Sequence, residues 1–326
     1  MTSGERFLVT GALGCIGAWV VRTLVRQGVP TVVFDVASDP HRLRLVMTAP
    51  ELERVAFVTG DITDLAAVEA ALKDNGITHV IHLAALQVPF CKADPTLGAR
   101  VNVVGTVNMF TAVKRAGLRQ LAYASSIAVY GHSEDYPGGP LAHDAAPRPH
   151  VLYGVYKLAN EGTARVYWSD DGIASIGLRP YTVYGPGRDQ GLTSSPTRAM
   201  LAAAAGEPFH IPFGGRCVYQ YTHDTAAAFI TAARAPANGA AVYNLGGNAV
   251  HMRDIVNAIE AAAPSARGRI TFDDKPLPFP ENMDDTAARA ALGALPVTPL
   301  KAGVLETVKM FTTALANQQL VYTLQE

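Results

Sequence analysis

The stretch TGALGCIG, residues 10–17, decides the fold because it joins an apolar strand pattern to a helical one. RFLVT at 6–10 precedes it, and apolar residues at helical spacing follow it. Gly11 would allow a tight turn, Gly14 a close backbone approach to a pyrophosphate, and Gly17 close packing of the helix on the sheet. The pyrophosphate would meet free N–H groups at the positive end of the helix. The spacing G-x-x-G-x-x-G also fits an ordinary turn, so its context has to decide.

That context is an alternation of strand and helix patterns through the first half of the chain. Short apolar runs predict strands, and the amphipathic stretches between them predict helices. Further strands are expected at 31–36, 55–61, 78–85, 120–126 and 174–179, and helices at 64–73, 96–116 and 152–168. Apolar strands that alternate with helices form βαβ units, whose parallel sheet is covered on both faces. Right-handed crossovers then give an α/β fold with a doubly wound parallel sheet.

The pattern loosens after Pro180, where glycine and proline become frequent. The run KPLPFP at 275–280 is incompatible with regular structure, because proline cannot continue a helix or a central strand. We expect a smaller, discontinuous C-terminal substrate lobe. Residues 218–247 would return to the main sheet through a strand, a helix from Asp224 and a final strand. The expected division is a nucleotide-binding domain of residues 1–179 and 216–247, and a substrate-binding lobe of residues 180–215 and 248–326.

The composition excludes several classes of protein. With 326 residues, 49% hydrophobic and 17% charged, the chain has material for a large core and is not disordered. Its formal charge of −1 leaves no basic face for nucleic acid, and no apolar run reaches the roughly 20 residues that span a bilayer. Three widely spaced cysteines do not suggest a disulfide framework, and His79 and His82 lack further ligands for a metal. We therefore expect a soluble, cytoplasmic enzyme without a metal site.

An acidic residue ends the second predicted strand. Asp35 lies where a carboxylate accepts hydrogen bonds from the ribose hydroxyls of an adenosine. A carboxylate there repels a 2′-phosphate, which favours NAD over NADP, whereas the alternative is a simple turn residue. Asp61 and Ile62, after the third strand, are placed to meet the adenine ring, although Asp61 equally fits a helix cap.

A tyrosine and a lysine lie four residues apart in a predicted helix. Tyr153 and Lys157 share a helix face, and the helix follows a strand that ends at Ser126. A neighbouring ammonium and the positive ring of an oxidised nicotinamide both favour the phenolate; about three pKa units, roughly 4 kcal/mol, would bring it near neutrality. Tyr153 could then take the proton of a substrate hydroxyl that Ser126 holds in line. The pair also occurs on ordinary surface helices, and Tyr156 is a rival whose next-turn partner cannot supply the charge.

Several motifs occur in the order seen in one family. They are TGALGCIG at 10–17, Asp35, Asp61-Ile62, HLAA at 82–85, VNVVGT at 101–106, YASSIAVYG at 123–131, YGVYK at 153–157 and LRPYTVYGPG at 178–187. Together they resemble the extended short-chain dehydrogenases/reductases, in the NAD-dependent epimerase/dehydratase branch. The resemblance covers about residues 5–190 well and the rest loosely. It implies a Rossmann fold and a bound nicotinamide dinucleotide, NAD.

The resemblance also implies roles for individual residues. Ser126, Tyr153 and Lys157 would be the catalytic set, and Asn102 would pin a helix beside the site. The implied cofactor contacts are Gly11, Leu13, Gly14, Cys15, Ile16, Gly17, Asp35, Asp61, Ile62, Leu83, Ala84, Ala85, Asn102, Ser125, Tyr153, Lys157, Tyr181 and Val183. The expected substrate contacts are Gln87, Ser126, Tyr153 and Thr182. A homodimer is also implied, in which the helices near 96–116 and 152–168 pack as a four-helix bundle.

Three departures from the family pattern bear on the substrate. Dehydratases of this branch carry Asp-Glu after the active Ser or Thr, whereas Ile127-Ala128 stands here and cannot transfer a proton. Sugar-nucleotide epimerases usually carry Asn at the position of Thr182, and an Arg that grips a diphosphate before the strand that begins here at Cys217. Arg216 or Arg188 could replace that arginine from a shifted register. The pattern favours a smaller polyhydroxylated substrate, such as a sugar or a sugar acid.

Three functions remain open. The main hypothesis is an NAD-dependent oxidoreductase that moves hydride from a secondary hydroxyl of a small carbohydrate or sugar-acid-like substrate to NAD, with Tyr153 as base. The alternative is an NAD-dependent epimerase of a sugar or nucleotide sugar, which returns the hydride to the opposite face and releases no NADH. The third is a non-catalytic protein that senses dinucleotides. Such proteins often lose the Tyr or the Lys, and both are present here.

Overall fold

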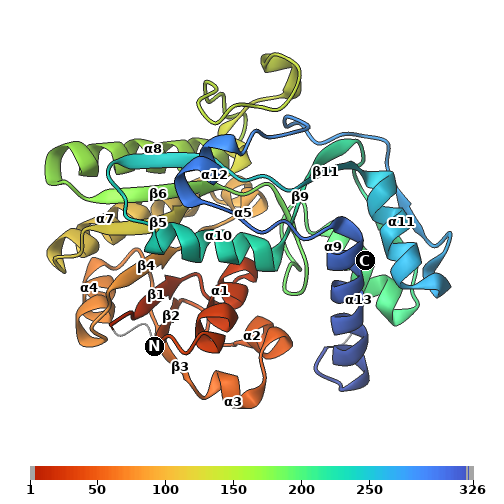
Figure 1. The fold of residues 1–326 in the computed structure, drawn as a ribbon, viewed down its shortest axis with the longest axis horizontal. Helices are drawn as coiled ribbons and strands as arrows, with labels where there is room; N and C mark the ends of the chain where they lie inside the picture. Colours follow the sequence, from red (N-terminus) through yellow and green to blue (C-terminus); the bar gives the residue numbers. More distant parts are fainter. Residues whose placement is uncertain (1–3, 321, 323–326) are drawn as a thin grey trace.

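A seven-stranded parallel sheet forms the centre of the computed structural model, which describes residues 4–320 and 322 (Figure 1). The strand order is β10-β6-β5-β4-β1-β2-β3, and each neighbouring pair is parallel. The strands are β1 (Phe7–Thr10), β2 (Thr31–Asp35), β3 (Val55–Thr59), β4 (His79–His82), β5 (Gln120–Ala124), β6 (Ala174–Arg179) and β10 (Ala240–Asn244). The order reverses at β1, so the predicted doubly wound α/β fold is confirmed.

Helices cover both faces of the sheet, because its central strands are apolar on both sides. One face packs against α1 (Cys15–Arg26) and α10 (Thr222–Arg234). The other packs against α4 (Leu65–Asp74), α7 (Gly105–Arg115) and α8 (Leu152–Asp171). Shorter helices in the connections are α2 (His41–Val46), α3 (Ala49–Leu52), α5 (Val88–Ala93) and α6 (Pro95–Ala99).

The single helix expected over 96–116 is interrupted. α6 runs through a π-helical turn, Arg100–Val104, into α7. Such widened turns are rare and often occur at functional sites. Here the widened turn holds Asn102 inside the molecule, where 1% of the residue is exposed.

The C-terminal lobe is built from segments far apart in the sequence. A mixed sheet joins β7 (Thr182–Tyr184), β9 (Arg216–Tyr221) and β11 (Asn248–His251), and a second pairs β8 (Phe209–Ile211) with β12 (Ile270–Phe272). Its helices are α9 (Ser195–Ala205), α11 (Met252–Ala262), α12 (Thr286–Leu292) and α13 (Leu300–Ala316). Of these, α9, α11 and α13 lie to the right of the main sheet in Figure 1.

One expectation for this region is wrong: the strand after residue 215 does not return to the main sheet. Only α10 and β10 return, and β10 occupies the edge of β6, with Ala240 opposite Ser175. No edge of β6 is left for β9, which pairs with β7 and β11. The pairing favours a boundary after Tyr221 rather than at 216, and the division into two domains stays a prediction.

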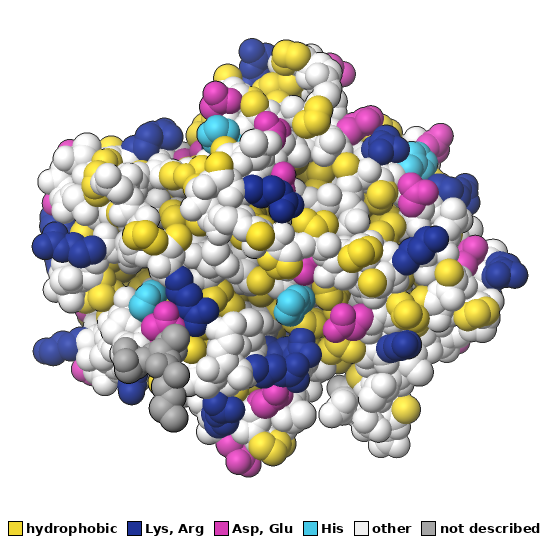
Figure 2. Space-filling view, in the orientation of Figure 1, with side chains coloured by type: hydrophobic (Ala, Val, Ile, Leu, Met, Phe, Trp, Pro, Cys, Tyr) yellow, Lys and Arg dark blue, Asp and Glu magenta, His cyan; other side chains and the backbone are white. Residues whose placement is uncertain are grey.

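The surface carries both signs of charge. On the face shown in Figure 2, basic and acidic side chains are interspersed, as the near-zero net charge leads one to expect. Within residues 4–320, no helix is long and apolar enough to cross a membrane. In the same part of the chain, no group of three or more His, Cys, Asp or Glu side chains could hold a metal ion.

Candidate active site

A cavity of about 730 Å³ opens at the carboxyl ends of the main strands. Its walls include residues that directly follow β1, β3, β4, β5 and β6, which is where open α/β sheets bind ligands. Every predicted cofactor contact except Asn102 lines it. Among the predicted substrate contacts, Gln87, Ser126 and Tyr153 line it, and Thr182 does not.

The glycine loop fits a bound pyrophosphate. Gly11 has φ +65°, and a Cβ there would lie 2.6 Å from the backbone N of Ala84. A Cβ on Gly17 would lie 2.4 Å from the carbonyl O of Gly11, so the helix could not pack this closely on the turn. Gly14 is the N-cap of α1 and supplies no side-chain cap, which leaves first-turn N–H groups for an anionic ligand.

Asp35 combines the two roles weighed for it. Its Oδ2 accepts a hydrogen bond from the N–H of Leu13 at 2.9 Å, and its Oδ1 accepts one from the N–H of Ala37 at 3.1 Å. The carboxylate thus braces the glycine loop and also borders the cavity. Its contact with a ribose stays a prediction.

The acid after β3 has a more local role. Asp61 Oδ1 accepts from the N–H of Thr63 at 2.8 Å, which makes a turn. The cap of α4 is Asp64, whose side chain accepts from the N–H groups of Ala66 and Ala67. Both Asp61 and Ile62 line the cavity, so the predicted adenine contact remains sterically open.

The predicted catalytic residues meet at the other end of the cavity. Lys157 lies 5.6 Å from the centroid of the Tyr153 ring, and its Nζ donates to the carbonyl O of Ala124 at 2.7 Å. Ser126 Oγ accepts from the N–H of Ala128 at 3.1 Å, which orients the hydroxyl at the end of β5. The structure therefore brings the three residues to one wall, as their spacing predicts.

The protein alone does not make Tyr153 a base. Burial raises its pKa to about 12, although the Ser126 hydroxyl and the positive charge of Arg188 act in the opposite direction. Burial also lowers the pKa of Lys157 to about 8. The expected pKa near neutrality thus depends on the positive charge that an oxidised nicotinamide supplies when bound.

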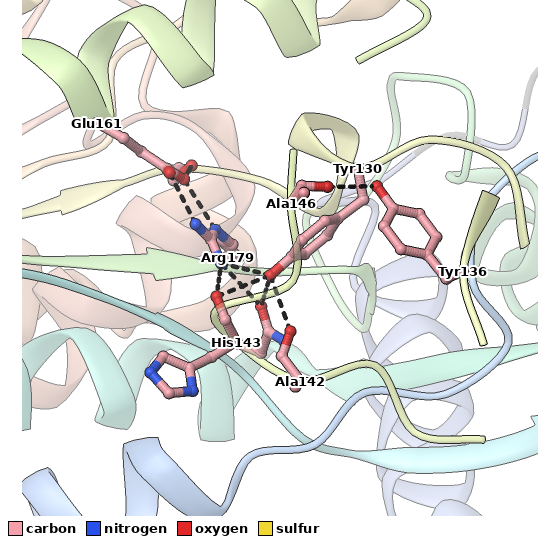
Figure 3. Close-up of polar contacts among 9 residues, drawn as sticks. Tyr130, Tyr136, Ala142, His143, Ala146, Glu161 and Arg179 are labelled. Atoms are coloured by element: carbon pink, nitrogen blue, oxygen red, sulfur yellow. Dashed lines mark hydrogen bonds and ion pairs between the residues drawn. The ribbon is translucent and has the colours of Figure 1, made fainter. Parts of the chain in front are cut away.

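A buried ion pair supports this wall from behind (Figure 3). Glu161, one turn after Lys157, accepts from Ser125 Oγ at 2.6 Å and from Arg179 Nε and Nη2 at 2.8 and 2.7 Å. Figure 3 shows Arg179 between Glu161 and the segment that carries Tyr130 and His143. Arg179 Nη1 donates to the carbonyl O of His143 at 2.6 Å and to the Tyr130 hydroxyl. The pair fixes Ser125, which borders the cavity.

Asn102 acts on the shape of the site and not on its lining. Its Oδ1 accepts from the N–H of Leu86 at 2.8 Å, and its Nδ2 donates to the carbonyl O of the same residue at 2.9 Å. It therefore holds the loop after β4, where Leu83 and Ala85 line the cavity. Asn102 does not line the cavity, so its position does not support the predicted direct contact with the cofactor.

Two expectations near β7 and β9 need correction. Side chains alternate from Tyr181, directly before β7, into the strand. Tyr181 and Val183 therefore line the cavity, while Thr182 faces away, with its Oγ1 3.5 Å from Cys217 Sγ. Arg216 does not line the cavity and donates to the carbonyl O of Ala249 at 3.0 Å. Of the two arginines considered as substitutes, only Arg188 reaches the site.

Several residues that line the cavity were not predicted from the sequence. Arg42 spans the gap between the two halves: its Nη1 donates to the carbonyl O of Leu13 at 2.9 Å, and its Nη2 lies 2.7 Å from Asp189 Oδ1. Phe279, from the proline-rich run, meets the Tyr181 ring edge-on at 6.2 Å between centroids. The loop after a Gly-Pro-Gly turn could have indicated Asp189, whereas no pattern marks Arg42 or Phe279.

Residues 7–246 match the family described as the NAD dependent epimerase/dehydratase family. The chain belongs to this family. UDP-glucose 4-epimerase from Mycolicibacterium smegmatis is 31% identical over 321 residues, which are 94% of this chain and 98% of that protein. The resemblance in the motifs is thereby confirmed.

Solved structures agree with the family assignment. The UDP-glucose 4-epimerase of Thermus thermophilus, in complex with NAD, superposes with a TM-score of 0.80 at 27% identity, over 95% of this chain and 100% of that one. MoeE5, in complex with UDP-glucuronic acid and NAD, gives 0.78 at 28% identity, with the same coverage. This family member is an NAD-dependent enzyme, as predicted. The relatives support the epimerase alternative better than the main dehydrogenase hypothesis.

Proposed function

We propose that this family member is an NAD-dependent epimerase that inverts a secondary alcohol of a sugar. When bound, NAD would supply the hydride-transfer chemistry at this site. Tyr153 takes the hydroxyl proton as the carbon loses its hydride, and returns the proton when the hydride rejoins the opposite face. Ser126 holds the reacting oxygen, and Lys157 holds the nicotinamide ribose. The relatives, which are named as 4-epimerases of UDP-sugars, support this reaction class.

One observation carries the choice of an epimerase: the loop after β7 is clasped to the nucleotide half. Trp19 Nε1 donates to the carbonyl O of Pro186 at 2.9 Å, and the Arg42 guanidinium forms a forked ion pair with Asp189. Both Arg42 and Asp189 line the cavity, so the clasp forms part of its wall. An epimerase regenerates NAD in each turnover and benefits from such retention, whereas a dehydrogenase has to release NADH.

A second candidate, a dehydrogenase of a free sugar acid, has its own support. The family resemblance implies an arginine near the start of β9 that grips a diphosphate, whereas this chain carries the buried Cys217 there. Arg216, beside it, is directed to Ala249 and away from the cavity. A substrate without a nucleotide would not need this grip.

One experiment separates the two candidates. The purified protein is first passed through gel filtration and assayed for NAD that stays bound. It is then incubated with UDP-glucose, UDP-glucuronate, glucose and glucuronate, while NADH absorbance and product stereochemistry are followed. Inverted product without NADH accumulation supports the epimerase. NADH that accumulates in proportion to oxidised product would overturn it in favour of the dehydrogenase.

The expected homodimer remains part of the proposal. α8 exposes Leu152, Val155 and Val166, and the neighbouring α6–π–α7 segment exposes Leu97 and Val104. An apolar stripe on two adjacent helices is what a four-helix bundle would bury. Val155→Asp should convert a dimer to a monomer in light scattering, whereas Leu305→Asp, on exposed α13, should not. A wild-type monomer would refute the dimer.

A cytoplasmic location also remains a proposal. Cys15, Cys91 and Cys217 are all free thiols, which suits a reducing compartment. Fractionation of the native cells, with antibody detection, would test it, and recovery from an oxidising compartment would contradict it.

A further inference from the structure

Arg188 has hydrogen-bonding capacity that the protein does not use. It follows the Gly-Pro-Gly turn after β7 and lines the cavity. Its Nη2 donates to Thr193 Oγ1 at 3.1 Å, whereas its Nε is buried without a hydrogen-bond partner in the described part of the chain. A buried guanidinium N–H without a partner is unfavourable, so a ligand that accepts a hydrogen bond from it would gain binding free energy.

A glycine brings a second polar side chain to the same place. Gly191 has φ +96°, and a Cβ there would lie 1.9 Å from Gln87 Oε1 and 3.3 Å from Arg188 Nη2. Only a glycine lets the loop approach this closely. Gln87 is the N-cap of α5, yet its side chain makes no capping hydrogen bond, so its amide is available to a ligand in the cavity.

Arg188 forms no ion pair within the described part of the chain, although Asp35, Asp39, Asp61 and Asp189 also line the cavity. Among the lining residues that the structure describes, the fixed cations are Arg42, Lys157 and Arg188. Arg42 is neutralised by Asp189, and Lys157 is held by the carbonyl O of Ala124 beside Tyr153. Burial raises the pKa of both the Cys15 thiol and the Tyr153 hydroxyl, and the positive charge of Arg188 opposes this rise at each, so Arg188 lies between the glycine loop and the catalytic tyrosine.

The geometry points to Arg188, assisted by Gln87, as the binding site for a carboxylate of the substrate. The guanidinium presents a planar fork of donors that matches the two oxygens of a carboxylate, and the single positive charge of Arg188 matches one negative charge. A diphosphate carries more charge and would need a second free cation. The substrate class is thus a sugar acid, such as a hexuronate. The inference rests on the proposed function only in assuming that the ligand is a sugar. Binding of the carboxylate can be measured separately from turnover.

The test measures binding to the NAD-loaded protein by calorimetry, with matched ligand pairs. One pair is glucuronate and glucose, and the other is UDP-glucuronate and UDP-glucose. We expect the acid of at least one pair to bind about 10- to 100-fold tighter than its neutral partner, as a charge-assisted forked contact would give. Arg188→Met should remove most of this preference and leave the affinity for the neutral sugar nearly unchanged. Arg188→Lys should keep part of it, because a point charge replaces the fork.

Control variants separate the loss of carboxylate binding from a loss of folding. Arg216→Met removes an arginine that lies outside the cavity and should keep the wild-type preference. Circular dichroism and bound NAD report whether each variant is folded. If Arg188→Met is not folded, Arg188→Lys and Gln87→Leu still have to lower the preference for the acid.

Equal binding of acid and neutral ligands by the wild type would overturn the inference. An equal loss for both UDP-sugars in Arg188→Met would assign the residue to the diphosphate instead. A loss of NAD would assign it to the cofactor. An acid preference without epimerisation would refute the proposed function and keep this inference.

Discussion

The nucleotide half and the substrate lobe present the cavity in different ways. In the nucleotide half, each wall is a short turn that directly follows a strand, and its chemistry is visible in a few consecutive residues, such as 10–17. In the lobe, the wall combines residues 181–193 with Phe279, nearly a hundred positions later in the sequence. The first half is therefore readable from local patterns, and the second is decided by long-range packing.

The two regions also use charge differently. Behind the nucleotide half, Glu161 and Arg179 form an ion pair whose side chains are 1% and 6% exposed. Across the cavity mouth, Arg42 and Asp189 form a pair whose side chains are 14% and 46% exposed. Removal of one partner of the buried pair should lower the free energy of unfolding strongly, because a buried charge is left without its counter-charge. Removal of one partner of the more exposed pair should lower it little, because water screens the remaining charge. The buried pair fixes a wall, whereas the more exposed pair contributes less to the stability of the fold.

The largest effect is expected at Tyr153. Tyr153→Phe removes the only proposed proton acceptor, so turnover should fall by about 100- to 10,000-fold while NAD affinity changes little. Steady-state kinetics and NAD titration measure the two quantities. Tyr156→Phe is the matched control, since that hydroxyl donates to the carbonyl O of Pro95 and points away from the site. If Tyr156→Phe loses activity and Tyr153→Phe keeps it, the assignment is reversed.

Next in size is the buried ion pair. Glu161→Gln leaves the Arg179 guanidinium without its counter-charge and should lower the free energy of unfolding by about 3–5 kcal/mol. Urea denaturation measures it. Glu51→Gln, which breaks the partly exposed pair with Arg26, should cost no more than about 1 kcal/mol. Equal losses for the two variants would contradict the distinction between a buried wall and a screened surface.

The glycine loop should show a smaller effect with a specific signature. Gly11→Ala forces a side chain into φ +65° and against Ala84, and should cost roughly 1–3 kcal/mol and weaken NAD binding. Gly206→Ala, at φ +77° in the lobe with no atom within 4 Å, should lose some stability and keep its NAD affinity. Thermal unfolding with and without NAD separates the two outcomes. Unchanged NAD affinity in Gly11→Ala would argue against the pyrophosphate position.

The smallest effect concerns the clasp. Asp189→Asn removes the counter-charge of Arg42, and NAD should dissociate a few-fold faster, since a half-exposed pair contributes about 1 kcal/mol or less. Stopped-flow displacement of NAD measures the rate, and added salt should reduce the difference. Arg44→Met, which removes an arginine of the same helix paired with Asp39, is the control and should leave the rate unchanged. An unaltered rate in Asp189→Asn would remove the main support for cofactor retention.

Several features could be predicted because they are local. A strand, a glycine turn and a helix are encoded by neighbouring residues, and so is the pairing of Tyr153 with Lys157 one turn later. The order of strands and helices then allows few topologies. The position of Asp35, at the end of β2 and at the cavity, follows from the same short-range pattern, and its contact with a ribose stays a prediction.

The errors arose where a contact joins distant segments. The pairing of β9 depends on β10 having taken the edge of β6, and the direction of Thr182 depends on the phase of a three-residue strand. Asn102 contacts Leu86 because a π-helical turn shifts it inward. None of these contacts produces a periodic pattern in the sequence, because each depends on which strand edges and surfaces other segments already cover.

The sequence by itself determined that this chain folds as a doubly wound α/β protein, carries a tight glycine loop after its first strand, and brings a tyrosine and a lysine of one helix to a serine at a strand end. Hydrophobic period and glycine spacing suffice for these features, since they act within a few residues. Only the tertiary structure decided that Arg188, Gln87 and Gly191 converge, and that Arg42 reaches Asp189 across the cavity. Those contacts form because tertiary packing brings together segments that lie far apart in the sequence, and no local pattern in the sequence indicates them.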